Sequence, residues 1–203
     1  PLTDAARALQ FVRSKASAWH LDPNRIVAAG GSAGACTSLW LAFHDEMADP
    51  TSDDPIARES TRLTAVAVSG AQTTLDPKQM KEWTPNSHYG AHAFGIPILA
   101  LENDRRTGRF TRFLESRASL MPWIDEYSPY ALVTADDPPV YMTYNNKPAL
   151  GHDAKDPTHS ANFGIKLKER LDSVKVPCEL VYPDAPDVQH PNLSDAVIGF
   201  LIP

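Results

Sequence analysis

The clearest chemical signal in the sequence is the pentapeptide Gly30-Gly31-Ser32-Ala33-Gly34. It matches the pattern G-x-S-x-G, in which small residues let a strand turn sharply into a helix and leave the serine hydroxyl accessible. An apolar run at residues 25–29 precedes it and a helical pattern follows, as this turn requires. In a chain of this length, Gly and Ser frequencies near 7% give only about 0.07 chance matches. We predict that Ser32 is a nucleophile and that the Ala33 N–H donates to the oxyanion formed by its attack.

A phosphate-binding turn is the structural alternative for a glycine-rich junction between a strand and a helix. The sequence contains neither the G-x-G-x-x-G pattern of dinucleotide-binding turns nor the P-loop signature. The nucleophile is therefore the favoured interpretation.

A serine nucleophile needs a base that takes its proton and an acid that orients the base. After an elbow of this kind the chain order is Ser, then Asp or Glu, then His, on loops that follow later strands. Asp156 follows the apolar run at 140–144 and is the predicted acid, with Asp153 as the alternative. His190 is the only histidine beyond the last predicted strand, 179–182, and is the predicted base.

The other histidines are interpreted as surface or loop residues. His88 and His92 have the spacing of ligands on one helix, but neighbouring glycines argue against that helix and therefore against a metal site. The proposed chemistry requires neither a metal nor a cofactor. The remaining four are His20, His44, His152 and His159.

Composition excludes several classes of function. The 203 residues carry a formal net charge of −6 without a basic stripe, which argues against a nucleic-acid partner. The apolar runs are far shorter than the ~20 residues of a membrane span. Two cysteines, Cys36 and Cys178, are too few for a disulfide framework or a zinc cluster and are interpreted as small buried residues.

The elements expected around these residues alternate between strands and helices, which predicts an α/β fold with a mostly parallel sheet and helices on both faces. Between the second and third strands, residues 74–137 show no sustained period and are predicted to form a lid or cap with short helices. The predicted strands are 25–29, 64–69, 140–144 and 179–182, and the predicted helices are 4–19, 35–47, 107–118, 160–173 and 194–201.

Three stretches of the sequence resemble one family. "LDPNRIVAAGGSAGA", "SPYALVTADDPPVYMTY" and "DAKDPTHSANFGIKLKERLDSVKVPCELVYPDAP" resemble the carboxylesterases and lipases of the α/β-hydrolase fold, in particular the feruloyl-esterase-like and acetylesterase-like branch. The resemblance implies a Ser-His-Asp triad, and its positions match Ser32, Asp156 and His190.

Two features of that family differ here. Its His-Gly-Gly oxyanion loop has no counterpart here, because no His-Gly dipeptide occurs in the sequence. The first strands of its sheet, which precede the elbow, have no counterpart either. The Gly-x-x-His turn of the family is replaced by Val188-Gln189-His190-Pro191. Residues 1–203 are therefore expected to be the C-terminal portion of one hydrolase domain, poorly active and prone to aggregate without the N-terminal strands.

The expected activity is hydrolysis of carboxylic esters, either small molecules or esters attached to polysaccharide, through an acyl-enzyme. The alternatives are a serine peptidase of the prolyl-oligopeptidase type and a binding protein of the same fold without catalysis. Aromatic residues of the lid are expected to line the substrate pocket or to pack within the lid. They are Trp83, Tyr89, Phe94, Trp123 and Tyr127.

Overall fold

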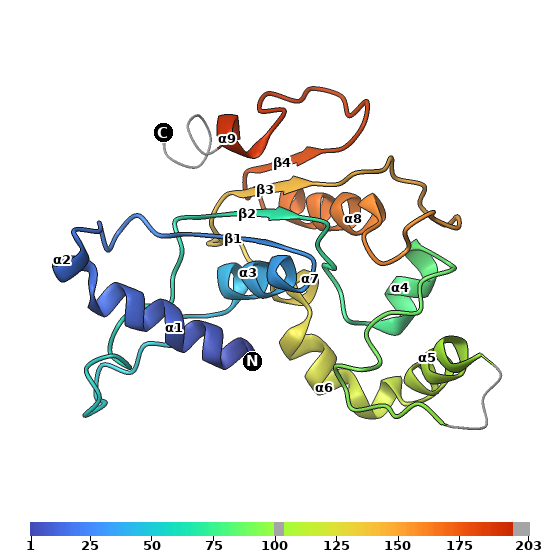
Figure 1. The fold of residues 1–203 in the computed structure, drawn as a ribbon, viewed down its shortest axis with the longest axis horizontal. Helices are drawn as coiled ribbons and strands as arrows, with labels where there is room; N and C mark the ends of the chain where they lie inside the picture. The colour runs from blue at the N-terminus through green and yellow to red at the C-terminus, as the bar shows by residue number, and fades with distance from the viewer. Residues whose placement is uncertain (100–103, 197–203) are drawn as a thin grey trace.

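The computed structural model describes residues 1–99 and 104–196, and within them the chain forms a sheet of four parallel strands (Figure 1). The sheet order β1-β2-β3-β4 follows the order of the chain. The register aligns the carboxyl ends of all four strands, so the loops that follow them leave from one edge. The strands are β1 (Val27–Gly31), β2 (Ala65–Ser69), β3 (Val140–Thr143) and β4 (Cys178–Val181).

The prediction of a parallel sheet is confirmed, and its four strands lie within two residues of the predicted ranges. β1 runs two residues further than its apolar run and includes Gly30 and Gly31. The strand therefore leads directly into the turn that carries Ser32.

Two helices cover one face of the sheet, and they are α3 (Ala33–Phe43) and α8 (Ala161–Ser173). Side chains alternate between the two faces of a strand, so the valines of β2 point toward these helices while Ala65 and Ala67 point the other way. Ala196 of α9 (Leu193–Ala196) packs on that second face, and Figure 1 shows α9 and α3 on opposite sides of the sheet. The predicted helix at 194–201 extends outside the described residues.

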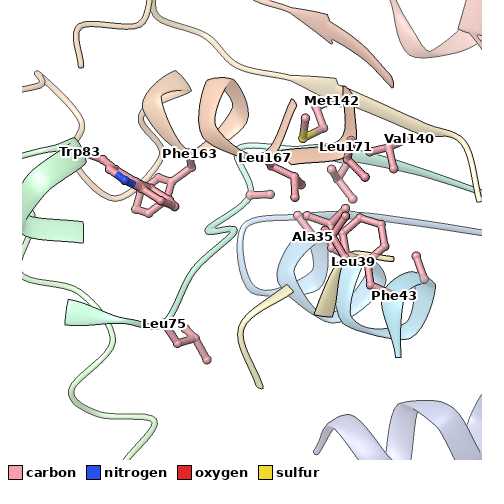
Figure 2. Close-up of a cluster of buried hydrophobic side chains, with 14 of the residues drawn as sticks. Ala35, Leu39, Phe43, Leu75, Trp83, Val140, Met142, Phe163, Leu167 and Leu171 are labelled. Carbon is pink, nitrogen blue, oxygen red and sulfur yellow. The ribbon is translucent and has the colours of Figure 1, made fainter. Parts of the chain in front are cut away.

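The core lies between the sheet and the two covering helices. Figure 2 shows side chains from α8, including Leu167 and Leu171, facing those of α3, including Leu39 and Phe43. All four are at most 2% exposed. Burial of such side chains contributes about 1.5–3 kcal/mol each to folding, so this core fixes α3 and α8 relative to the strand ends.

The N-terminal helix is interrupted where one continuous helix was expected. The helices are α1 (Leu2–Ser14) and α2 (Ala16–Trp19). Lys15 lies between them, and His20, with φ of 56°, ends the second in a left-handed conformation.

The segment between β2 and β3 contains short helices, as the sequence predicts. They are α4 (Pro77–Trp83), α5 (Arg105–Glu115), α6 (Arg117–Tyr127) and α7 (Pro129–Leu132). The one helix predicted here, 107–118, covers most of α5 and the start of α6, and α6 contains Pro122. Asp76 caps α4 and forms an ion pair with Arg117 at the start of α6, which ties the two helices together.

No helix in the described part of the chain is long and apolar enough to cross a membrane.

Candidate active site

Ser32 lies in the turn between β1 and α3, in a backbone conformation that non-glycine residues rarely adopt. Its φ is 52° and its ψ is −118°. Its backbone N–H donates to the Ser69 carbonyl at the end of β2, at 3.0 Å. Backbone strain of this kind costs about 1–3 kcal/mol and persists only where the surrounding structure enforces it. Here the hydrogen bond to Ser69 of β2 holds Ser32 in this conformation. The Ser32 side chain remains exposed.

Glycine is required at position 30 because the first turn of α3 passes close to β1. A Cβ at Gly30 would lie 2.5 Å from the Gly34 carbonyl carbon and oxygen. A Cβ at Gly34 would meet nothing within 4 Å. Gly30 and Gly34 therefore have different roles, and of these two only Gly30 permits the close approach of strand and helix.

The Ser32 hydroxyl is hydrogen-bonded to a histidine, and that histidine to an aspartate. Ser32 Oγ lies 2.9 Å from His159 Nε2, and His159 Nδ1 lies 2.9 Å from Asp156 Oδ2. With the proton on Nδ1 the ring donates to the carboxylate, which leaves Nε2 to accept the serine proton. This is the arrangement by which a neutral imidazole acts as a base toward serine.

A tight turn in the loop between β3 and α8 brings His159 and Asp156 together. Asp156 Oδ1 accepts the backbone N–H groups of Thr158 and His159, each at 3.2 Å. Partial burial raises the pKa of Asp156, but hydrogen bonds from the His159 ring and backbone lower that pKa more, so it lies below its ordinary value. The carboxylate is therefore ionised at neutral pH and can orient the imidazole.

Space for the His159 ring is provided by Gly70, directly after β2. Gly70 has φ of +58°, and a Cβ there would lie 3.4 Å from both Cβ and Cδ2 of His159. A left-handed conformation at this point favours glycine. The end of β2 thus supports both Ser32, through Ser69, and the histidine.

His190, the base predicted from the sequence, lies against Glu179 of β4. Its Nδ1 lies 2.6 Å from Glu179 Oε2, and the Glu179 carboxylate also accepts the His190 backbone N–H. Tyr141, which packs with Ala196 on the α9 face, donates its hydroxyl to the His190 carbonyl. Ser32 lies past the end of β1, at the opposite edge of the sheet from β4. This geometry favours His159 over His190 as the base.

Sequence reasoning missed His159 because it searched for the base only beyond the last strand. The available signal was the spacing Asp-x-x-His immediately before a helix, which allows a single turn to present both side chains. Asp156 is brought to the site as predicted. The alternative acid, Asp153, is exposed three residues upstream.

A cavity of about 690 Å³ opens beside Ser32. Its floor is formed by α3, where Ala33, Cys36 and Thr37 face it, and apolar side chains supply most of its walls. Burial raises the pKa of the Cys36 thiol to about 12, so this sulfur stays protonated. Of the five lid aromatics, which the sequence left between the pocket wall and lid packing, four line the cavity: Tyr89, Phe94, Trp123 and Tyr127. The fifth, Trp83, packs in the core against Tyr130 and Phe163.

The described residues contain no group of three His, Cys, Asp or Glu side chains that could hold a metal ion.

Comparison with known families places most of the chain in one of them. A family model described as BD-FAE, feruloyl-esterase-like α/β-hydrolases, matches residues 1–150. The chain belongs to the BD-FAE family. No curated protein matches it.

Solved structures similar to this chain include a bifunctional hydrolase and two esterases by their titles. The acetyl ester-xyloside bifunctional hydrolase of Caldicellulosiruptor lactoaceticus is 21% identical with a TM-score of 0.60, over 90% of this chain and 54% of its own. A truncated carbohydrate esterase from gut microbiota is 15% identical with a TM-score of 0.58, over 89% and 58%. Esterase 2 of the planctomycete Thermogutta terrifontis is 21% identical with a TM-score of 0.56, over 89% and 51%.

These likenesses show that this BD-FAE member has the α/β-hydrolase fold. The chain spans about half the length of these solved structures.

Proposed function

We propose that this BD-FAE chain carries the nucleophile, base and acid of a carboxylic ester hydrolase: Ser32, His159 and Asp156. The observation that carries the proposal is the continuous hydrogen-bonded chain from the Ser32 hydroxyl through the His159 ring to the Asp156 carboxylate. The geometry of such a triad, rather than the order of its members in the sequence, identifies it.

In the first half of the reaction, Ser32 Oγ attacks the ester carbonyl carbon while His159 Nε2 takes the hydroxyl proton. The negative charge that develops on the carbonyl oxygen is stabilised by the Ala33 N–H, at the N-terminus of α3. The tetrahedral intermediate collapses, the bond to the alcohol oxygen breaks, and His159 gives its proton to that oxygen. The alcohol leaves and the acyl group remains on Ser32.

In the second half, His159 removes a proton from water, whose oxygen attacks the acyl carbon. Collapse of the second intermediate returns the proton to Ser32 and releases the carboxylic acid. Throughout, Asp156 holds the ring in one orientation and stabilises its positive charge.

The substrate is proposed to be a small or carbohydrate-linked ester. Two of the similar solved structures are titled an acetyl ester-xyloside bifunctional hydrolase and a carbohydrate esterase. The largely apolar lining of the cavity beside Ser32 suits an apolar part of an ester. The same titles favour an ester over a peptide as the substrate. In this proposal residues 74–137 act as the lid of a single hydrolase domain, since they supply most of the aromatic wall of the cavity.

The test is covalent labelling of the purified full-length protein with a fluorophosphonate, followed by peptide mapping. Esterase 2 of T. terrifontis is described as phosphoramylated by tabun, which supports an organophosphorus probe. We expect one adduct, on the peptide that contains Ser32, together with hydrolysis of short-chain aryl esters. Both should be lost in Ser32→Ala and kept in Ser17→Ala, an exposed serine on α2. Unchanged ester hydrolysis in Ser32→Ala would remove this serine from the mechanism.

A further inference from the structure

The loop that carries Asp156 and His159 is held by two amide side chains from the segment between β2 and β3. On one side, Gln72 Nε2 donates to the Thr158 carbonyl at 2.7 Å and to the Gly70 carbonyl at 3.3 Å. Gln72 is fully buried directly after β2, so this contact joins the loop to the rigid end of the sheet.

On the other side, Asn86 forms a reciprocal pair with the backbone of Ala154. Its Nδ2 donates to the Ala154 carbonyl at 2.9 Å, and its Oδ1 accepts the Ala154 N–H at 3.0 Å. Ala154 lies two residues before Asp156, while its neighbours Asp153 and Lys155 are exposed. Asn86 therefore holds the loop at the point where the chain approaches the acid from solvent.

Asn86 is itself fixed in a turn at the end of α4. The Ser87 N–H donates to the Thr84 carbonyl at 2.8 Å. The buried Asn162 of α8 donates to the Thr84 hydroxyl at 2.9 Å and to the Trp83 carbonyl at 2.7 Å. The turn is thus anchored to the core, which makes Asn86 a rigid contact and not a mobile side chain at the surface.

The chain leads from Asn86 to the wall of the substrate cavity within three residues. Tyr89, followed by Ala93 and Phe94, lines the cavity beside Ser32. One short segment therefore contacts the acid-bearing loop through Asn86 and lines the cavity beside Ser32 through Tyr89.

We propose that Asn86 is a positioning residue that links the cavity wall to the Asp156–His159 pair. The inference rests on the proposed function in one respect, since it assigns a catalytic effect to the orientation of that pair. With both hydrogen bonds present, Asp156 is held where the His159 ring meets the Ser32 hydroxyl. Without them the loop keeps the Gln72 contact, its own turn and, upstream, the bonds of Gly151 and Ala149 to Trp83 and Asn162. The backbone at Ala154 loses its two side-chain hydrogen bonds, and misplacement of a reacting group by about 1 Å can reduce the rate about 100-fold.

The experiment compares Asn86→Ala and Asn86→Asp with Gln10→Ala in the full-length protein. Asn86→Asp keeps the acceptor for the Ala154 N–H and loses the donor. Gln10 is the matched control, because its buried amide also bonds two backbone carbonyls, of Ala57 and Glu59, far from the site. Turnover of an aryl ester is normalised to the concentration of fluorophosphonate-reactive sites, so that loss of folded protein does not count as loss of rate.

We expect kcat to fall about 10- to 100-fold in Asn86→Ala, with KM within about 3-fold and a smaller loss of kcat in Asn86→Asp. Gln10→Ala should lower the thermal midpoint and leave kcat unchanged. An unchanged kcat in Asn86→Ala, or a loss that Gln10→Ala reproduces, would overturn the proposal.

Amide hydrogen exchange provides a readout that does not depend on turnover. In Asn86→Ala, exchange should accelerate across residues 154–160 relative to residues 161–173 of α8, because local opening follows the loss of tethering contacts. Unaltered exchange in the loop would refute the positioning role even in an active enzyme. Accelerated exchange in a protein without Ser32-dependent turnover would refute the proposed function and keep Asn86 as the tether of the loop.

Discussion

A comparison of substitutions at Gly30 and Gly34 provides a sharp test of the local structure around Ser32. In Gly30→Ala, the new Cβ would lie 2.5 Å from the carbonyl carbon and oxygen of Gly34 and 2.9 Å from the Ala35 nitrogen. All three are backbone atoms held by α3, so no side chain can move to relieve the overlap. In Gly34→Ala, the new Cβ meets nothing within 4 Å, and position 34 is helical.

The expected changes in the free energy of unfolding follow from these distances. Overpacking of a well-packed site costs about 1–3 kcal/mol, and contacts this short with backbone place Gly30→Ala at about 3 kcal/mol or more. For a chain of this size, ~3 kcal/mol corresponds to a midpoint lowered by about 6–12 °C. Gly34→Ala should be neutral or stabilising by up to about 1 kcal/mol, because alanine favours a helix over glycine.

The assay is thermal unfolding of both variants, with the fluorophosphonate labelling rate of Ser32 measured at 25 °C. Gly30→Ala should lose stability and label poorly, since the strand can no longer deliver the serine into its turn. Gly34→Ala should keep both the thermal stability and the labelling rate of Ser32. Equal behaviour of the two variants, or a stable and reactive Gly30→Ala, would refute the close packing of β1 against α3.

Three further predictions concern the surroundings of the site. Gly70→Ala should lower kcat and cost about 1 kcal/mol of stability, because it strains a residue with φ of +58° and crowds the His159 ring; matched stability and kinetic measurements check it. Arg117→Ala should destabilise the protein by about 1–3 kcal/mol in urea unfolding at pH 7, because Asp76, 4% exposed, loses a charged partner. Burial raises the pKa of Asp76, but the Arg117 hydrogen bonds and charge, with the backbone N–H groups of Lys78 and Gln79, together lower that pKa more. The stability that the ionised carboxylate contributes is therefore present above its ordinary pKa of about 3.9, is lost as pH falls below it, and should shrink in Arg117→Ala. The Cys36 thiol, whose pKa is raised to about 12 by burial, should resist iodoacetamide at pH 8 in the folded protein and react after denaturation.

The sheet and the turn that carries Ser32 could be predicted from the sequence because both depend on local patterns. Buried parallel strands are continuous apolar runs, and the turn at Ser32 needs small residues at fixed positions. The segment between β2 and β3 was harder, because its helices are short and Pro122 lies inside α6. The contact of this segment with α8 through Asn162 is a tertiary interaction, and the spacing of apolar residues in the sequence does not indicate it.

The positions of His190 and His159 illustrate the limit of reasoning from chain order. His190 satisfies the expected order, and yet its ring is bonded to Glu179 in β4. His159 reaches Ser32 because Asp156 accepts two backbone N–H groups and folds the loop back on itself. That turn depends on side-chain hydrogen bonds within the loop, and the sequence shows only that Asp and His are three residues apart.

The most direct test of His159 as the proposed base compares two histidine variants of the full-length protein, His159→Gln and His190→Gln. Ester turnover is measured per folded molecule, with Ser32→Ala as the baseline. A positioned general base contributes about 10²–10⁴-fold to the rate, so His159→Gln should lose at least about 100-fold and approach the Ser32→Ala level. His190→Gln should retain activity within about 10-fold of the unmodified protein. The reverse result, with activity kept in His159→Gln and lost in His190→Gln, would contradict the assignment of His159 as the base.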